Sequence, residues 1–253
     1  KISADKNERL IWPLDGSGIE VTFKSDSQSG SHKLRGRKSV FHGTTDLVYL
    51  PIDTEIEITG SGRVIIAEAP ARNSKPVKFL SKDAFPNVIR GAGPESRQIH
   101  DFGGVQALDA DRFLVVEVIV PAGNWSGVPP HKHDTYIPGV ESNLEEIYYF
   151  EVAPDRNLST PKNSDPKGIF RGYSADDRLY DITTEVRSGD VVLVPYGWHG
   201  PVGGMPAYDM YFMNVMAGPD PERVWNLTDE PAHAWIRESW KNKAVDPRLP
   251  YTE

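Results

Sequence analysis

The apolar segments of this chain are short, and turn residues interrupt them along its whole length. Its 253 residues include 22 glycines and 21 prolines, and the longest apolar stretch, Phe113 to Val120, already contains Glu117. Apolar or alternating runs of about four to eight residues between turn signals are typical of β-strands. Such runs occur at residues 19–23, 55–59, 63–66, 113–120, 146–152, 169–173, 191–194 and 210–215. The pattern predicts an all-β protein.

The arrangement of these strands narrows the fold class further. Long helices nowhere alternate with the strands, which argues against a parallel α/β fold and favours an antiparallel barrel or sandwich. The Gly60-Ser61-Gly62 turn between residues 55–59 and 63–66 predicts a β-hairpin. The one predicted helix is short, covers about residues 231–240, and has Thr228 or Asp229 as its candidate N-cap.

A short internal sequence repeat suggests two related barrels in tandem. Residues 46–51 read DLVYLP and residues 190–195 read DVVLVP, and each is followed by a further apolar strand that ends in a proline. Repetition of this kind indicates duplicated structural units. We therefore expect a domain of residues 1–103 and a second of residues 104–253, joined near Gly103-Gly104.

Charge and composition exclude several classes of protein. The net charge is −8 and no basic run is present, which argues against nucleic-acid binding. No apolar stretch approaches the roughly 20 residues of a membrane-spanning helix, so no membrane partner is expected. The absence of cysteine excludes disulfides and thiolate metal sites. Residues 1–8 lack the apolar core of a signal peptide, and we expect a cytoplasmic location.

Three histidines and a glutamate have the spacing of a metal site. His131 and His133 are one residue apart, so on a strand both rings project from the same face. Glu146 opens the next strand, and His199 follows the strand that ends at Pro195. Three imidazoles and a carboxylate would bind one divalent metal and leave coordination positions open for a substrate. The alternative is a surface His-x-His pair, and the remaining histidines have no partner at ligand spacing: His32, His42, His100 and His233.

Glu145 and Glu146 compete for the carboxylate position. Glu146 shares a strand face with Tyr148, whereas Glu145 shares the other face with the charged Glu151. The face without a second charge is the one that suits a closed barrel. We therefore predict Glu146 as the ligand.

These motifs resemble the cupin superfamily, and more closely the 5-deoxy-glucuronate isomerase family. The resemblance is carried by residues 124–126 (NWS), 129–134 (PPHKHD), 144–149 (LEEIYY), 208–211 (YDMY) and 214–219 (NVMAGP). It implies two tandem jelly-roll-like cupin barrels, a bicupin, with a short C-terminal helix. The N-terminal barrel is expected to be degenerate and without metal, because no His-x-His precedes His131. The C-terminal barrel would hold one divalent ion of Zn, Mn, Fe, Ni or Co.

The resemblance implies the aldose–ketose isomerisation of 5-deoxy-D-glucuronate to 5-dehydro-2-deoxy-D-gluconate in myo-inositol catabolism. Two segments depart from the family pattern. Trp198-His199-Gly200 stands where the family reads Tyr-His-Pro, and Phe170-Arg171-Gly172-Tyr173 stands where it reads Phe-Gln-Arg-Val-Tyr.

The isomerisation needs a base that moves a proton between neighbouring carbons. The candidates are Asp209, Tyr148 and Glu145. Each could instead have no catalytic role: Asp209 as a turn residue, Tyr148 as a core residue and Glu145 as a surface carboxylate. Arg171, in an apolar strand, is the first candidate for contact with the substrate carboxylate, and an internal salt bridge is its alternative. Lys132 is the second, although alternation directs it away from both metal histidines.

Other functions are compatible with the same ligand set. A related isomerase could act on a keto-uronate from pectin breakdown, and a cupin dioxygenase could use the ligands on iron. A sensory barrel would be expected to carry a DNA-binding helical module, for which the sequence has no helix-turn-helix pattern. We expect a small acidic sugar as the partner, and a monomer or homodimer.

Overall fold

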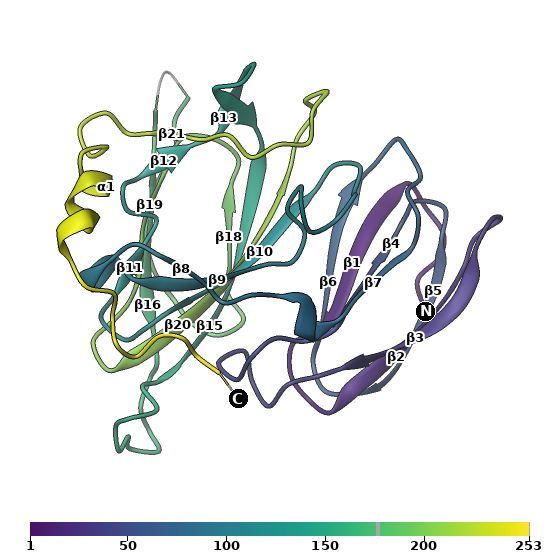
Figure 1. The fold of residues 1–253 in the computed structure, drawn as a ribbon, viewed down its shortest axis with the longest axis horizontal. Helices are drawn as coiled ribbons and strands as arrows, with labels where there is room; N and C mark the ends of the chain where they lie inside the picture. The colour runs from purple at the N-terminus through teal and green to yellow at the C-terminus, as the bar shows by residue number, and fades with distance from the viewer. Residues whose placement is uncertain (176–177, 253) are drawn as a thin grey trace. The chain divides into compact units, whose positions relative to one another are not determined.

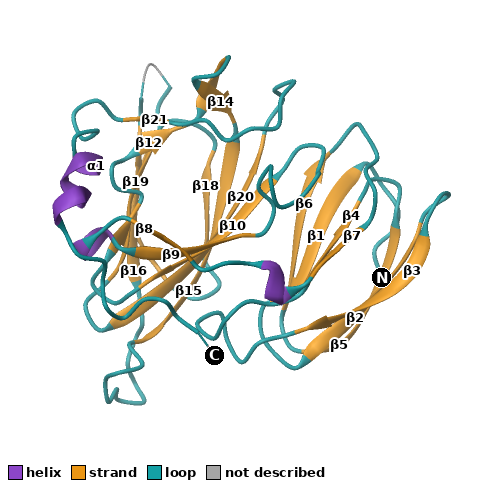
Figure 2. Cartoon of the chain, viewed as in Figure 1, coloured by secondary structure: helices purple, strands orange, loops and turns teal. Residues whose placement is uncertain are grey.

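The computed structural model describes residues 1–175 and 178–252, and these are almost entirely strand and loop (Figures 1 and 2). The chain forms two compact units. The first consists of residues Lys1–Pro86 and His100–Leu114 with Thr252, and the second of Asn87–Ile99 and Val115–Tyr251. The chain therefore passes from one unit to the other after residues 86, 99 and 114. The domain boundary near residue 103 stays a prediction from the sequence.

The first unit contains two antiparallel sheets. One has the order β6-β1-β4-β7, and the other has the order β3-β2-β5. Their core is a cluster of aliphatic and aromatic side chains contributed by both sheets: Ile11, Ile19, Val21, Phe23, Leu34, Val48, Leu50 and Ile56. The strands are β1 (Asn7–Pro13), β2 (Gly18–Lys24), β3 (Ser29–Arg35), β4 (Leu47–Leu50), β5 (Glu55–Ser61), β6 (Val64–Pro70) and β7 (Lys78–Leu80).

The predicted hairpin at Gly60-Ser61-Gly62 is wrong. Strand β5 pairs with β2, and β6 pairs with β1, so this turn carries the chain from one sheet to the other. Gly60 and Gly62 have φ values of 126° and 112°, a region that favours glycine. A Cβ on Gly62 would lie 2.4 Å from the carbonyl oxygen of Asp15. The glycines thus permit a close crossing between sheets, which the local sequence does not distinguish from a hairpin.

The second unit carries two larger sheets. One has the order β18-β15-β20-β10-β9-β8, and the other has the order β17-β16-β19-β12-β21, with β11 paired to β19. A further small sheet joins β13 to β14. The strands of the first sheet are β8 (Val88–Arg90), β9 (Arg97–Asp101), β10 (Leu114–Val120), β15 (Glu145–Pro154), β18 (Val191–Val194) and β20 (Tyr208–Ala217). The others are β11 (Trp125–Ser126), β12 (His131–Lys132), β13 (Asp134–Ile137), β14 (Glu141–Asn143), β16 (Gly168–Tyr173), β17 (Asp181–Val186), β19 (Trp198–Gly204) and β21 (Thr228–Asp229).

Aromatic side chains connect the two large sheets of this unit. The Tyr148 ring of β15 lies 5.1 Å from Phe170 of β16 and 5.2 Å from Phe212 of β20, measured between centroids. Phe150 lies 6.3 Å from Phe170. These rings are buried, so the interior next to the inward face of β15 is apolar.

Helical structure is confined to short segments. The C-terminal helix α1 (Ile236–Ser239) is shorter than predicted and is followed by the 3₁₀ turn η3 (Trp240–Asn242); η1 (Lys82–Ala84) and η2 (Gly93–Glu95) are also 3₁₀ turns. Thr228 and Asp229 do not cap the helix, because they form β21 and pair with β12. In the described residues no helix has the length and apolar character needed to cross a membrane.

Candidate metal centre

His131 and His199 are direct partners on neighbouring strands. Strand β12 pairs with β19 so that these two residues face each other, and their ring centroids are 4.4 Å apart. The His133 ring lies 4.9 Å from His199 and 6.1 Å from His131. One ring nitrogen from each histidine lies within 4.8 Å of the other two. This group could hold a metal ion.

A β-bulge in β19 directs His199 into the cluster. Gly172 of β16 pairs with His199, but Phe170 pairs with Val202, so β19 has one extra residue between these positions. The bulge contains Gly200, whose φ is 104°, and a Cβ there would lie 2.0 Å from the Gly127 carbonyl oxygen. The glycine that departs from the family pattern thus has a conformational role next to the cluster.

Backbone carbonyls fix the orientation of all three rings. The Nδ1 atoms of His131, His133 and His199 lie 3.4, 3.2 and 3.3 Å from the carbonyl oxygens of Pro129, Leu144 and Gly197. A carbonyl oxygen only accepts, so each Nδ1 carries the hydrogen and donates it. The Nε2 lone pairs are then left for a metal ion, which is the common arrangement of ligand histidines.

Glu146 completes the cluster from β15. Its Oε2 lies 3.1 Å from Nε2 of both His133 and His199, and Asn214 on β20 donates a hydrogen bond to its Oε1. Glu146 is 2 % exposed, whereas Glu145 lies on the exposed side of the strand. The two glutamates therefore have the orientations that strand alternation predicts.

The electrostatics differ between members of the cluster. Burial lowers the pKa of His133, but the hydrogen bond to Glu146 outweighs it and raises that pKa. Burial, and then repulsion from His199 and His133, hold the pKa of His131 well below its usual range. Burial opposes ionisation of Glu146, but His199 and His133 outweigh it and lower the pKa of that carboxyl. The buried Nε2 of His199 has no hydrogen-bond partner although it is close to Glu146. Three imidazoles, one of them with an unpartnered Nε2, and an ionised carboxylate are a donor set that fits a divalent metal ion.

The three candidate bases occupy different environments. Tyr148 is buried on the same face of β15 as Glu146, 6.2 Å from His199 between ring centroids. Burial and then the charge of Glu146 raise its pKa well above the usual value. Asp209 pairs with Ala153 of β15, so it lies on the opposite face, where Tyr251 and the Ala122 N–H donate to it. Only Tyr148 among them faces the histidines.

Both candidate contacts for a substrate carboxylate already have partners. Arg171 forms an ion pair with Asp181 and donates to the hydroxyl of Thr183 at 3.0 Å. Lys132 donates to Asp134 at 2.8 Å and to Glu141 at 2.7 Å. The structure does not bring either cation into the histidine cluster.

Lys132 instead belongs to a network that supports the cluster. Asp134 accepts from Lys132, from Arg178 at 2.7 Å and from the backbone N–H of Gly197 at 2.8 Å. Burial raises the pKa of Asp134, but Lys132 and the Gly197 N–H outweigh it and bring the pKa to about 2. The network links β13 to the turn that precedes His199.

Sequence reasoning missed Asn214, which orients the Glu146 carboxylate. The residue lies opposite Tyr148 in the pairing of β15 with β20. It is part of the 214–219 segment that carries the family resemblance, but its contact depends on the register of two strands that are distant in sequence.

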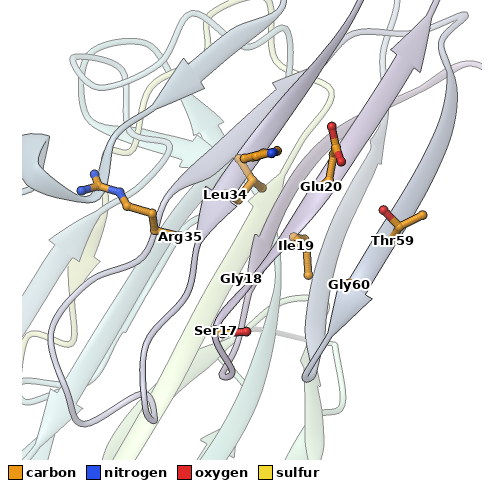
Figure 3. A pocket seen from close by; sticks show the side chains of 9 residues that line it. Ser17, Gly18, Ile19, Glu20, Leu34, Arg35, Thr59 and Gly60 are labelled. Carbon is orange, nitrogen blue, oxygen red and sulfur yellow. The ribbon is translucent and has the colours of Figure 1, made fainter.

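An open pocket in the first unit has a different character. It lies on β2, β3 and β5, and Figure 3 shows Glu20, Arg35 and Gly60 among its lining residues. Arg35 is paired with Asp46 and Asp83, and Glu20 accepts from Ser31. Its lining residues include no histidine, so the pocket has no group comparable to the histidine cluster.

The chain is similar to a known protein family and to several curated proteins. The model of the KduI/IolB family matches residues 1–236. The 5-deoxy-glucuronate isomerase of Geobacillus thermodenitrificans is 39% identical over 194 residues, which are 76% of this chain and 66% of that protein, just under two thirds of its length. The enzyme of the same name from Bacillus subtilis (strain 168) is 37% identical over 236 residues, 92% of this chain and 81% of the relative.

Solved structures agree on the architecture. An IolB-like protein from Salmonella typhimurium has a TM-score of 0.79 at 34% identity, covering 93% of this chain and 84% of that one. Oxalate decarboxylase of Bacillus subtilis, a protein with Mn(II) centres, has a TM-score of 0.57 at 12% identity, covering 90% and 66%. Hazelnut vicilin has a TM-score of 0.53 at 10% identity, covering 85% and 70%. The last two show the fold alone, and the predicted all-β bicupin fold is confirmed.

Proposed function

The chain belongs to the KduI/IolB family, and we propose that it isomerises 5-deoxy-D-glucuronate to 5-dehydro-2-deoxy-D-gluconate in myo-inositol catabolism. Its curated relatives are named 5-deoxy-glucuronate isomerase. The observation that carries the proposal is the convergence of three histidine nitrogens within 4.8 Å of one another, beside the Glu146 carboxylate.

His131, His133, His199 and Glu146 would hold one divalent metal ion of the Zn, Mn, Fe, Ni or Co group. A bound ion would polarise the substrate carbonyl and stabilise the negative charge that develops on its oxygen. The protein's part is to keep the imidazoles correctly turned, through the carbonyls of Pro129, Leu144 and Gly197.

The chemistry moves a proton from C2 to C1 and a hydrogen from one oxygen to the other, with no net change in atoms or electrons. Of the three candidate bases, Tyr148 is the one whose position supports a role in this transfer, because it faces the histidines from β15. Its phenol would donate a hydrogen bond to the enediolate oxygen. The surrounding Phe170 and Phe212 rings exclude water and strengthen that interaction.

The decisive experiment assays one metal-loaded preparation with two substrates. Conversion of 5-deoxy-D-glucuronate, followed by nuclear magnetic resonance, is expected, with no consumption of dissolved oxygen. Preferential turnover of the pectin-derived keto-uronate would reassign the substrate, and oxygen uptake would indicate the dioxygenase instead. The cytoplasmic location and the monomeric or homodimeric state stay predictions from the sequence.

A further inference from the structure

Two arginines face each other on the β8–β9 hairpin of the second unit. Strands β8 and β9 are neighbours (Figure 1). They are antiparallel, and Arg90 pairs directly with Arg97. Directly opposed residues lie on the same face of a sheet, and like charges in that position destabilise it. The pair therefore needs a compensating negative charge.

The described part of the chain supplies no ion-pair partner to either arginine. Arg97 donates through Nη1 to the backbone carbonyl of Glu95 at 3.0 Å, and its buried Nε has no acceptor. The Glu95 carboxylate lies nearby but binds Lys243 at 3.2 Å. By contrast, five other arginines in the described part of the same unit form ion pairs with carboxylates: Arg171, Arg178, Arg187, Arg237 and Arg248.

A second donor without an acceptor lies beside Arg97. The guanidinium carbon is 5.4 Å from the centroid of the Trp240 ring, and the buried Nε1 of Trp240 also has no hydrogen-bond partner. Arg237 lies 5.6 Å from the same ring but is paired with Asp229. Two buried N–H groups beside an uncompensated cation are the surroundings that an anion would complete.

Arg97 lies in the same sheet as the strand that carries Glu146 and Tyr148. Strands β9 and β15 are three strand spacings apart, about 14 Å between backbones. The Tyr148 phenol is one of the groups that affect the pKa of Arg97. Burial, then repulsion from Arg237 and Arg90, lowers the pKa of Arg97 to about 10, so the guanidinium stays charged at neutral pH.

We propose that Arg97 binds the carboxylate of the sugar acid, with Arg90 adding positive charge at the exposed edge of the hairpin. The identity of the sugar acid rests on the proposed function, the isomerisation of 5-deoxy-D-glucuronate. A guanidinium presents two parallel N–H donors to a carboxylate, and contact with Trp240 holds its plane. Arg97 takes the role that the sequence assigned to Arg171, whose charge is already used by Asp181.

Binding rather than turnover provides the main test. Calorimetric titration of the metal-loaded protein compares D-glucuronate with D-glucose, which lacks the carboxylate. Arg97→Gln is expected to weaken D-glucuronate binding about 10- to 100-fold and to leave D-glucose binding unchanged. Arg187→Gln is the matched control, because Arg187 is paired with Asp165 at the surface, and it should alter neither ligand.

Kinetics with 5-deoxy-D-glucuronate give an independent measure. Arg97→Gln should raise KM with little change in kcat, as expected for a lost ground-state contact. If the wild-type protein lacks isomerase activity but Arg97→Gln still loses carboxylate selectivity, the proposed function fails and the binding role stands. If Arg97→Gln does not fold, Arg97→Lys is the second variant. It keeps the positive charge but not the two parallel N–H donors, and its affinity for D-glucuronate should fall about 10-fold.

Three results would overturn the proposal. One is equal weakening of D-glucuronate and D-glucose in Arg97→Gln, and another is loss of D-glucuronate binding in Arg171→Gln with none in Arg97→Gln. The third is displacement of D-glucuronate by inorganic phosphate at equal concentration, which would indicate a general anion site.

Discussion

The Nε2 atom of His199 lies 3.1 Å from Oε2 of Glu146, yet the two atoms do not form a hydrogen bond. The His133 Nε2 lies at the same distance from the same oxygen. Between His133 and Glu146 this contact is a hydrogen bond. The Nδ1 atom of His199 faces the Gly197 carbonyl, so the electron pair of its Nε2 atom points toward the carboxylate. That contact is unfavourable for a neutral ring alone and becomes favourable around a cation that both groups share.

The first prediction distinguishes the two adjacent glutamates. Glu146→Gln should reduce bound metal at least about 100-fold, because it removes the carboxylate that contacts both His133 and His199. Glu145→Gln is the control, since that side chain is exposed on the other face of β15. Metal content by plasma mass spectrometry after dialysis measures both. Loss confined to Glu145→Gln would contradict the assignment.

The second prediction concerns the residue that orients Glu146. Asn214→Leu should weaken metal affinity about 10- to 100-fold, because the Oε1 atom loses its donor. Met213→Leu, on the opposite face of β20, is a control that conserves volume and should keep the metal. Competition with a chromophoric chelator gives both affinities. An Asn214→Leu protein with unchanged affinity would show that the amide has no part in holding the carboxylate.

The site could be predicted where it depends on side-chain alternation along a single strand. The shared face of His131 and His133 and the inward direction of Glu146 follow from the two-residue period of a strand. Alternation does not say which strands become neighbours. The sequence therefore predicts a hairpin at the Gly60–Gly62 turn, although its two strands lie in different sheets.

The ion-pair partners of the arginines cannot be predicted from the sequence either. An arginine in an apolar strand indicates a buried charge, but its partner is set by register. Arg171 meets Asp181 because β16 pairs with β17, and Arg97 meets Arg90 because β8 pairs with β9. The residue that sequence reasoning favoured for a substrate contact thus has a protein carboxylate, and a residue it did not consider lacks one.

The third prediction tests the bulge next to His199. Gly200→Ala should destabilise the protein by about 3 kcal/mol or more and lower its metal content, because a Cβ would clash with the Gly127 carbonyl at a φ of 104°. Gly139→Ala is the matched control: its φ is 73°, but nothing lies within 4 Å of the new Cβ. It should cost about 1 kcal/mol and keep the metal. Urea unfolding and metal analysis separate the two effects, and equal costs would contradict a role for close approach.

The last prediction concerns pH and the C-terminal segment that supports Arg97. Asp246 accepts from Arg248 at 2.6 Å and from Asn124 at 3.0 Å, and its backbone N–H donates to Ser96, the neighbour of Arg97. The hydrogen bond from Arg248, stronger than the opposing effect of burial, lowers the pKa of Asp246 to about 2. A carboxyl whose pKa is lower in the folded state stabilises the fold above the unfolded pKa, near 3.8.

That contribution is lost as the pH falls from about 4 to about 2, because the unfolded chain binds the proton first. Asp246→Asn should therefore lower the free energy of unfolding by about 1–2 kcal/mol at pH 6, allowing for solvent screening of this partly exposed pair. The difference from the wild type should shrink as the pH approaches 2. Asp165→Asn, which breaks an exposed pair with Arg187, should have a smaller effect. Urea unfolding at pH 6, 4 and 3 tests this, and a difference that grows on acidification would show that Asp246 does not stabilise the fold as a carboxylate.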